Sequence, residues 1–350
     1  MRLMLTENQL ERCVAWLESH GSAPVRYLTC VNLMGFDPSS PAARELWSQA
    51  QSDAVIAEIF GKQRRDGSWC DGGPWAPGPS YTPKNGYTPV SPKYVTTAWL
   101  LSILGDMGYT VEDERVMSAC EWVMGWRRPN GVLSETRAPP TESDYDENPR
   151  NVPCRMSIQM DGLAKVGFGV DPRMKKSWDL LLGWQREDGG WVQEGHRDGT
   201  AAPYKVWGRS CPWVSYFAAS ALYHSGITEH RETLKEALEF IVWHLDQKQP
   251  EEIRRFFWHG HEPVKELIML GEMGFSPDQR SICTLLDWLE TMYDPDEGFF
   301  RYMGKPVSKM SRKLDGGDLR VMKYRLFHQA EPDWLTYWAT RAEYSFLGHR

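Results

Sequence analysis

The stretch Gln63-Arg64-Arg65-Asp66-Gly67-Ser68-Trp69 returns later in the chain as Gln185-Arg186-Glu187-Asp188-Gly189-Gly190-Trp191. Two weaker copies keep the spacing, namely Arg127-Arg128-Pro129-Asn130-Gly131-Val132-Leu133 and Asp294-Pro295-Asp296-Glu297-Gly298-Phe299-Phe300. Their glycines, at positions 67, 131, 189 and 298, lie 64, 58 and 109 residues apart, so the last interval is two periods with one copy eroded. A period of roughly 50 to 65 residues fits a helix pair plus a substantial loop. The chain is therefore predicted to be a helical repeat protein.

The composition argues against several classes of protein. The 350 residues carry a net charge of -7 and contain no run of Lys and Arg, so we expect no nucleic-acid partner. No apolar run approaches the roughly 18 residues of a membrane span, and the first 13 residues show no signal-peptide pattern. The cysteines form no CxxC pair, which is typical of reduced thiols; they number seven, at positions 13, 30, 70, 120, 154, 211 and 283. We expect a cytoplasmic protein.

Two sets of helices alternate along the sequence. The outer set has apolar residues on one side only, with helices predicted near residues 6–20, 41–62, 112–126, 172–185, 229–245 and 277–291. Each inner helix is predicted to begin after a proline, at Pro24, Pro92, Pro153, Pro212, Pro263 and Pro332. The inner helices are predicted to end at glycines, at Gly35, Gly108, Gly167, Gly226, Gly274 and about Gly348. Because the inner helices are rich in small and apolar residues, we expect them to be buried on both sides.

This alternation predicts an all-α fold, an (α/α)6 toroid of six inner and six outer helices, forming a single domain over residues 1–350. The outer-to-inner connections are long and must lie over one end of the toroid; they span residues 66–92, 127–153, 186–211, 246–262 and 292–332. Loops of this length are usually functional and would roof or rim a central cavity. The alternative is that they only seal a packed toroid.

The Gln-x-x-Asp-Gly-Ser/Gly-Trp turn resembles the QW repeat of squalene cyclases and of protein prenyltransferase β subunits, which are helical toroids. In such a turn Gln ends one helix, Gly permits the tight turn, and Trp packs back on the neighbouring helix pair. The two good copies and two worn copies extend the resemblance over most of the chain at the level of architecture. Fold alone does not define chemistry, because function depends on the site that a fold carries.

The resemblance also implies an acidic motif for protonating an alkene, PDVDDTA-like, at the start of an inner helix. Here the corresponding segment is Pro92-Lys93-Tyr94-Val95-Thr96-Thr97-Ala98, in which every acidic position holds Lys, Val or Thr. The neighbouring cluster of Asp144, Asp146 and Glu147 could supply the acid instead, since adjacent carboxylates raise one another's pKa. The alternative interpretation is a solvated acidic loop.

The prenyltransferase resemblance implies a zinc site built from an Asp-x-Cys motif and a His on the next inner helix. Cys211 and His261 stand at those places, with His259 nearby, and thiolate and imidazole are ligands that zinc accepts. Arg209 stands where the resemblance implies an Asp, and its positive charge disfavours the binding of a metal cation. A buried cysteine and solvent-exposed histidines are the alternative. Zinc or magnesium is therefore the possible cofactor.

Positions two residues beyond each initiating proline should lie at a similar height in the toroid, and they are Arg26, Tyr94, Arg155, Val214, Lys265 and Trp334. Buried cations are costly unless paired, so these predict either internal ion pairs with Asp161, Glu262 or Glu266, or an anionic ligand group such as diphosphate or carboxylate. Deeper positions predict an aromatic wall with a few polar groups, formed by Gln159, Tyr216, Tyr337 and Trp338. In the loops, His196 and Tyr204 are candidates for general acid/base work.

Three functions follow as hypotheses. The first is an isoprenoid-processing enzyme, cyclase-like or prenyltransferase-like, that binds a small hydrophobic substrate with an anionic end. The second is a lyase or hydrolase acting on uronate carbohydrates, because such toroids also carry that chemistry; loop aromatics would then stack on sugars, namely Trp75, Tyr81, Tyr87 and Trp207. The third is a toroid scaffold without catalytic activity. An open groove with surface aromatics would favour the second, and a closed apolar pocket the first.

Overall fold

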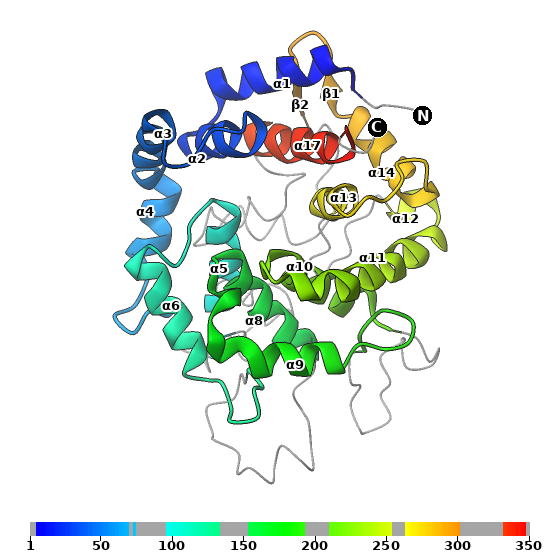
Figure 1. The fold of residues 1–350 in the computed structure, drawn as a ribbon. Helices are drawn as coiled ribbons and strands as arrows, with labels where there is room; N and C mark the ends of the chain where they lie inside the picture. Colours follow the sequence, from blue (N-terminus) through cyan, green and yellow to red (C-terminus); the bar gives the residue numbers. More distant parts are fainter. Residues whose placement is uncertain are drawn as a thin grey trace, which may run out of the picture. The chain divides into compact units, whose positions relative to one another are not determined.

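The structure is a computed structural model, and it describes residues 5–69, 73–74, 96–133, 153–192, 210–253, 263–301 and 332–347. The chain groups into two compact units, one formed by Met1–Gly61 with Leu245–Arg350 and the other by Lys62–His244. Taken separately, the described residues of both units are mostly helical, with two short strands as the exception (Figure 1), which confirms the all-α class. The expected alternation of outer and inner helices is present in both. Closure into a toroid and a single domain stay predictions.

The unit formed by Lys62–His244 contains three helices that are buried almost all round, α5 (Thr97–Asp106), α8 (Pro153–Lys165) and α10 (Pro212–His224). Helix α8 packs against both α5 and α10 (Figure 1). By contrast α6 (Glu114–Met124), α9 (Lys175–Gly183) and α11 (Arg231–Asp246) each bury one face and expose the other. The 3-10 turns Phe168–Val170, Pro172–Met174 and Thr228–His230 lead into the outer helices. The buried three are thus the inner helices of the predicted alternation.

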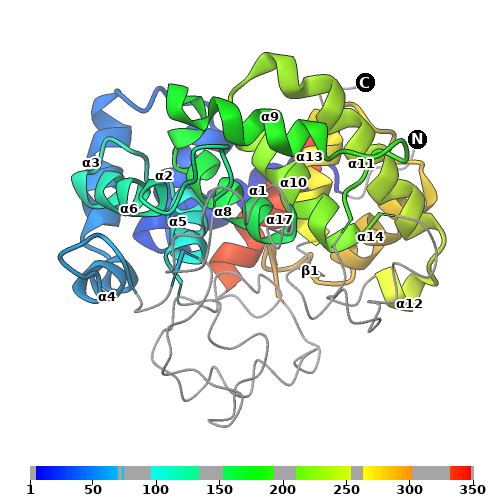
Figure 2. The ribbon, with the colours of Figure 1, turned by 90° about the horizontal axis from the view of Figure 1, so that it is seen from below.

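In the other unit α17 (Pro332–Leu347) is the most deeply buried helix, and it packs against α13 (Pro263–Glu272) and α1 (Glu7–His20). Helix α1 runs alongside α17 in Figure 1, and in Figure 2 it lies behind α17. The remaining helices are α2 (Ala23–Leu28), α3 (Pro41–Gln51), α4 (Ala54–Gly61), α12 (Pro250–Ile253) and α14 (Arg280–Glu290). A short antiparallel hairpin joins β1 (Tyr293–Asp294) to β2 (Phe299–Phe300), with Tyr293 opposite Phe300.

Three of the repeated turns share one backbone hydrogen-bond pattern, although only two of them keep the full sequence motif. In each turn the backbone N–H of the second residue donates to the carbonyl of the residue four positions later. The backbone N–H of the turn glycine donates to the carbonyl of the second residue. The first bond measures 2.8, 2.8 and 2.9 Å for Arg64 to Ser68, Arg128 to Val132 and Arg186 to Gly190. The second measures 3.0, 2.9 and 2.8 Å from Gly67, Gly131 and Gly189. The worn copy at 127–133 is therefore a true structural repeat, whereas the copy at 294–300 forms the β hairpin.

The motif glutamine ties each full turn to the next outer helix. Gln63 Nε2 donates to the Gly67 carbonyl at 3.0 Å and to the Arg115 carbonyl in α6 at 2.8 Å. Gln185 Nε2 does the same with Gly189 at 2.9 Å and with Thr233 in α11 at 3.1 Å. One amide thus holds both the turn and the start of the following outer helix.

A second fastening joins the last position of a turn to the following inner helix through a hydroxyl group. The backbone N–H of Trp191 donates to Ser215 Oγ of α10 at 3.0 Å, and that of Trp69 to Thr97 Oγ1 of α5 at 3.3 Å. The hairpin copy repeats this contact, because the Phe300 N–H donates to Thr336 Oγ1 of α17 at 2.9 Å. The Trp191 ring itself turns back to its own outer helix, where Nε1 donates to the Leu181 carbonyl at 2.7 Å.

Among the described residues, the glycines with positive φ fall into the two predicted groups. The helix-end group is Gly35, Gly108, Gly167, Gly226 and Gly274, and the turn group is Gly67, Gly131, Gly189 and Gly298. At Gly189 there is a further reason for glycine, since a Cβ would overlap the carbonyl oxygen of Glu236 in α11. The turn glycine therefore serves both the left-handed conformation and the close approach of the next outer helix.

Some boundaries differ from the sequence expectation. The outer helix predicted over 41–62 is broken after Gln51, and the second half restarts where Asp53 Oδ1 accepts the Val55 N–H at 2.8 Å. An Asp placed this way is an N-cap, which the unbroken apolar pattern conceals. The first inner helix passes from α2 into a π-helical turn, Thr29–Leu33. The second inner helix, α5, begins at Thr97, five residues beyond Pro92. Most of the long connections lie outside the described residues.

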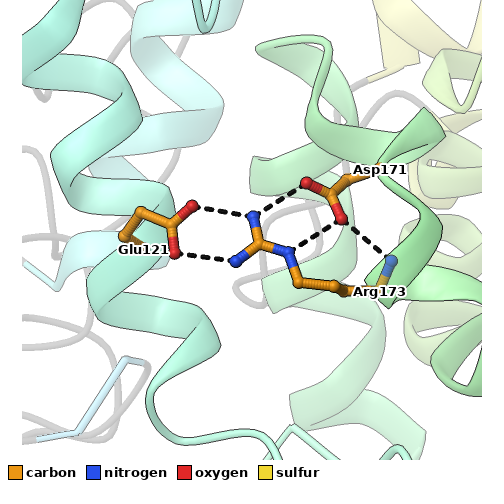
Figure 3. A network of polar contacts seen from close by, with 3 residues as sticks. All are labelled: Glu121, Asp171 and Arg173. Atoms are coloured by element: carbon orange, nitrogen blue, oxygen red, sulfur yellow. Dashed lines mark hydrogen bonds and ion pairs between the residues drawn. The ribbon is translucent and has the colours of Figure 1, made fainter.

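Arg173 links two successive outer elements on the surface of the unit formed by Lys62–His244. Its guanidinium makes a two-bond contact with Glu121 of α6, at 2.9 and 2.7 Å, and two further bonds to Asp171 at 2.9 and 2.8 Å (Figure 3). The contact holds the pKa of both carboxyls below the ordinary value. Because all three side chains are partly exposed, this network positions the elements more than it stabilises them.

Candidate functional site

The candidate site is clearest on α17, where three large aromatic residues are buried in succession. Trp334, Tyr337 and Trp338 all lie in the first two turns of this helix. The ring centroids of Trp334 and Tyr337 are 6.4 Å apart and those of Tyr337 and Trp338 are 4.9 Å apart, both in edge-to-face geometry. All three are residues that the sequence singled out for substrate binding. Their role in substrate binding stays a prediction.

Lys265 of α13 joins this cluster. Its Nζ lies 4.9 Å from the centroid of the Trp338 ring, within the range of a cation–π interaction, and the residue is only 8% exposed. On the same ring Arg341 lies at 6.0 Å, and its guanidinium approaches Glu272 of α13 at 3.4 Å. Lys265 was predicted as a cation of the cavity mouth, whereas Arg341 and Glu272 were missed because they lie deeper along their helices. A buried cation against an aromatic face is a suitable place for an anionic group of a ligand.

A polar residue on the first inner helix reaches the same cluster. Asn32 lies in the π-helical turn, and its Nδ2 donates to the Tyr337 hydroxyl at 2.7 Å. An extra residue in a helix changes which side chains face a neighbour, and π-helical turns occur frequently at functional sites. No sequence pattern in this chain indicates such a turn. Arg26, the predicted cation on α2, is half-buried in the same unit.

In the unit formed by Lys62–His244 the residues predicted to bind substrate each have a different set of neighbours. Gln159 of α8 is fully buried and donates from Nε2 to the carbonyl of Leu133, the last residue of the worn turn, at 3.2 Å. Tyr216 of α10 is buried with its ring 5.0 Å from that of Phe217, in edge-to-face geometry. Arg155 is half-buried near the start of α8. Gln159 therefore contributes to fastening the repeat, which its place on an inner helix did not indicate.

A buried polar network connects the three inner helices of this unit. Asp161 of α8 accepts from Ser102 of α5 at 2.8 Å and from Ser220 of α10 at 2.5 Å. Lys165 lies 3.6 Å from Asp161 and 3.0 Å from Asp106. Asp161 was considered from the sequence as a partner for a cation, and it has one, although the cation is Lys165 and not one of the predicted ring. This cluster is an internally satisfied network.

Cys211 caps the N-terminus of α10 and is buried, and burial raises the pKa of its thiol. The described residues include no group of three Asp, Glu, His or Cys that could hold a metal. His259 and His261, which the sequence pairs with Cys211, lie outside the described residues, so the zinc site stays a prediction.

Several predicted site residues lie outside the described residues. They are Tyr94, Asp144, Asp146, Glu147, His196, Tyr204, His259 and His261. The hypotheses that assign them to acid/base chemistry or to metal binding stay predictions.

An open groove of about 720 Å³ lies beside the second full turn, on the exposed face of α11. Phe240 and Trp243 form its apolar part, with Trp243 39% exposed, and its other lining residues are Arg186, Glu187, Asp188, Gly189, Glu236 and Glu239. Composition and repeat pattern gave no indication of this groove.

No protein-family model matches the chain, and no curated protein sequence matches it. Solved structures are similar at low identity. A protein from Actinoplanes gives a TM-score of 0.44 at 14% identity, covering 97% of this chain and 99% of its own. The type II terpene cyclase MstE from Scytonema, in a variant bound to the product merosterolic acid A, also gives 0.44 at 14% identity, with 98% and 97% covered. Another variant of MstE, bound to the substrate geranylgeranyl dihydroxybenzoate, gives 0.44 at 12% identity over the same shares.

Within the described ranges, helices long and apolar enough to cross a membrane are absent.

Proposed function

We propose that the chain is an isoprenoid-processing enzyme, cyclase-like in its chemistry, that acts on a small hydrophobic substrate with an anionic end. The observation that carries the proposal is the contact of Lys265 on α13 with the ring of Trp338 on α17, where Trp338 packs on Tyr337 and Tyr337 on Trp334. The repeated turns support it, because in each full copy the glutamine bonds to the turn and to the next outer helix, and the turn glycine has a positive φ.

The residues divide between two tasks. Lys265 supplies a positive charge in a place with little water, where an ion pair with a carboxylate or diphosphate is stronger than at the surface. The aromatic rings offer apolar area to a hydrocarbon chain and a negative π face to positive charge that develops on it. Asn32 orients the Tyr337 hydroxyl. The acid that starts the reaction is proposed among Asp144, Asp146, Glu147, His196 and Tyr204.

The carbohydrate hypothesis keeps one supporting observation, the open groove with the exposed ring of Trp243. An aromatic face beside carboxylates is a surface on which sugars stack. The groove lies on an outer helix, and Arg186 is the one cation among its lining residues, beside the carboxylates of Glu187, Asp188, Glu236 and Glu239.

The proposed function is tested by native mass spectrometry of the purified chain with a panel of ligands. The panel contains geranylgeranyl diphosphate, geranylgeranyl dihydroxybenzoate (the substrate bound by a variant of MstE), a neutral triterpene, and uronate oligosaccharides. We expect retention of the two anionic prenyl compounds and weaker retention of the triterpene. Retention of uronates alone would replace the isoprenoid proposal with the carbohydrate one.

A further inference from the structure

A buried carboxyl group lies where α1 packs against α17, away from the residues of the candidate site. Glu343, in the second half of α17, is 5% exposed. One of its oxygens accepts the backbone N–H of Leu5, just before α1, and Oε1 has no hydrogen-bond partner among the described residues. Burying a carboxyl with one unsatisfied oxygen is unfavourable, and the free-energy penalty is much larger when the carboxyl is ionised than when it is protonated.

The surroundings of Glu343 hold other polar groups but little positive charge. Cys13 of α1 is fully buried beside Thr340, and Tyr293 of β1 has a hydroxyl without a partner among the described residues. Burial, with the Glu343 charge as a smaller contribution, raises the pKa of the Cys13 thiol to about 11. The cluster therefore consists of neutral groups at neutral pH.

The charged residues around this cluster do not neutralise Glu343. From α1 come Glu7, Glu11 and Arg12, and from α14 comes Glu290. Arg12 donates to the backbone carbonyls of Pro295 and Asp296, at 2.7 and 2.6 Å. The other elements packed on α17 bring the charged residues Arg26, Lys265, Glu266 and Glu272, of which Lys265 contacts Trp338 and Glu272 contacts Arg341.

We propose that the contact between α1 and α17 is a pH-sensitive latch, held shut while Glu343 carries its proton and opened when this carboxyl ionises. In the shut form the neutral carboxyl accepts the Leu5 N–H and fits the buried cluster. In the open form α1 lifts from α17, water reaches the carboxylate, and the proton is released to solvent. The buried residues of α1 that become exposed are Leu10, Cys13 and Leu17. The latch does not depend on the proposed function.

The direction of the pH effect follows from the titration of Glu343. Burial raises its pKa from the ordinary value of 4.5 to about 8 in the shut form, with a smaller contribution from Glu290. The open form binds its proton with the ordinary pKa. The latch is therefore strongest below about pH 4.5, weakens steadily as the pH rises, and loses its further pH dependence above about pH 8.

Hydrogen–deuterium exchange of the full chain at pH 5.5 and pH 7.5, corrected for the intrinsic exchange rate, tests the latch. In the wild type we expect the opening constant of α1 peptides to rise on the order of 50-fold over this interval. In Glu343→Gln, which keeps a neutral side chain of the same shape, it should change less than about threefold, because no proton is released on opening. Glu290→Gln, which removes an exposed carboxylate near the cluster, is the matched control and should keep the wild-type behaviour.

Peptides from α6 and α9, which belong to the other unit, are the internal reference. A pH-independent α1, or an equal change in α1, α6 and α9, would overturn the latch. The comparison of α1 with α6 in the wild type decides the question even where Glu343→Gln does not fold.

Discussion

At the residue scale the repeat depends on single atoms more than on overall hydrophobicity. The glutamine, aspartate and glycine of a turn each make a contact that another residue type cannot make in the same place. Asp188 accepts from the Ser210 hydroxyl at 2.6 Å and from its N–H at 3.0 Å, in addition to the Gly190 N–H at 3.3 Å. A motif of seven residues is therefore readable in the sequence even where most helices show no similarity to one another.

Gly189→Ala tests this dependence. The substitution forces a side chain into a backbone conformation with φ of +81° and places its Cβ against the Glu236 carbonyl. We expect the free energy of unfolding to fall by about 2 to 4 kcal/mol, measured by urea denaturation. Gly183→Ala is the matched control, because a Cβ at this helix-end position meets no atom within 4 Å. The control should be neutral or stabilising by up to about 1 kcal/mol, and equal losses in both variants would contradict the account.

At the element scale, inner helices are held together by polar groups as well as by packing. Asp161→Ala removes the carboxylate that joins α5, α8 and α10. The buried side chains of Ser102, Ser220 and Lys165 then lose their contact with it. We expect a loss of about 2 to 4 kcal/mol, reduced because Lys165 keeps Asp106.

Asp179→Ala is the control for this prediction. It breaks an exposed ion pair with Lys175 at 2.8 Å, which should cost under about 1 kcal/mol. Urea titrations of the two variants measure the difference, and similar small losses would mean that the buried network contributes little to holding the three helices together.

The element scale also separates what the sequence could predict from what it could not. Helix order, the glycine ends and the inner helix starts other than that of α5 follow from local rules, because prolines and glycines act within their own helix turn. Three features depend on how neighbouring helices pack: the π-helical turn, the break before Asp53 and the Arg341–Glu272 contact. No short sequence pattern records such packing. Glu343 gave no signal, since an isolated Glu in an amphipathic helix normally faces water.

At the scale of the whole molecule, a mostly helical chain with repeated turns can serve several functions, so the site must decide among them. The cluster on α13 and α17 combines buried aromatic area with a cation, and this combination suits a ligand with a hydrocarbon body and an anionic end. The groove on α11 combines one exposed ring with carboxylates and suits a different kind of ligand. Binding therefore distinguishes the two functions better than further comparison of folds.

The most direct measurement is an isothermal titration of geranylgeranyl diphosphate into the wild type, Lys265→Met and Lys175→Met, with the melting temperature of each variant recorded. Lys265→Met keeps the length and apolar stem of the buried lysine, and Lys175→Met removes a lysine whose side chain is 77% exposed. The account predicts that Lys265→Met binds at least about tenfold more weakly, as expected for a lost charge-assisted contact, while Lys175→Met binds as the wild type does. Equal affinity in all three proteins would contradict it. So would weaker binding by Lys265→Met that is accompanied by a large fall in its melting temperature.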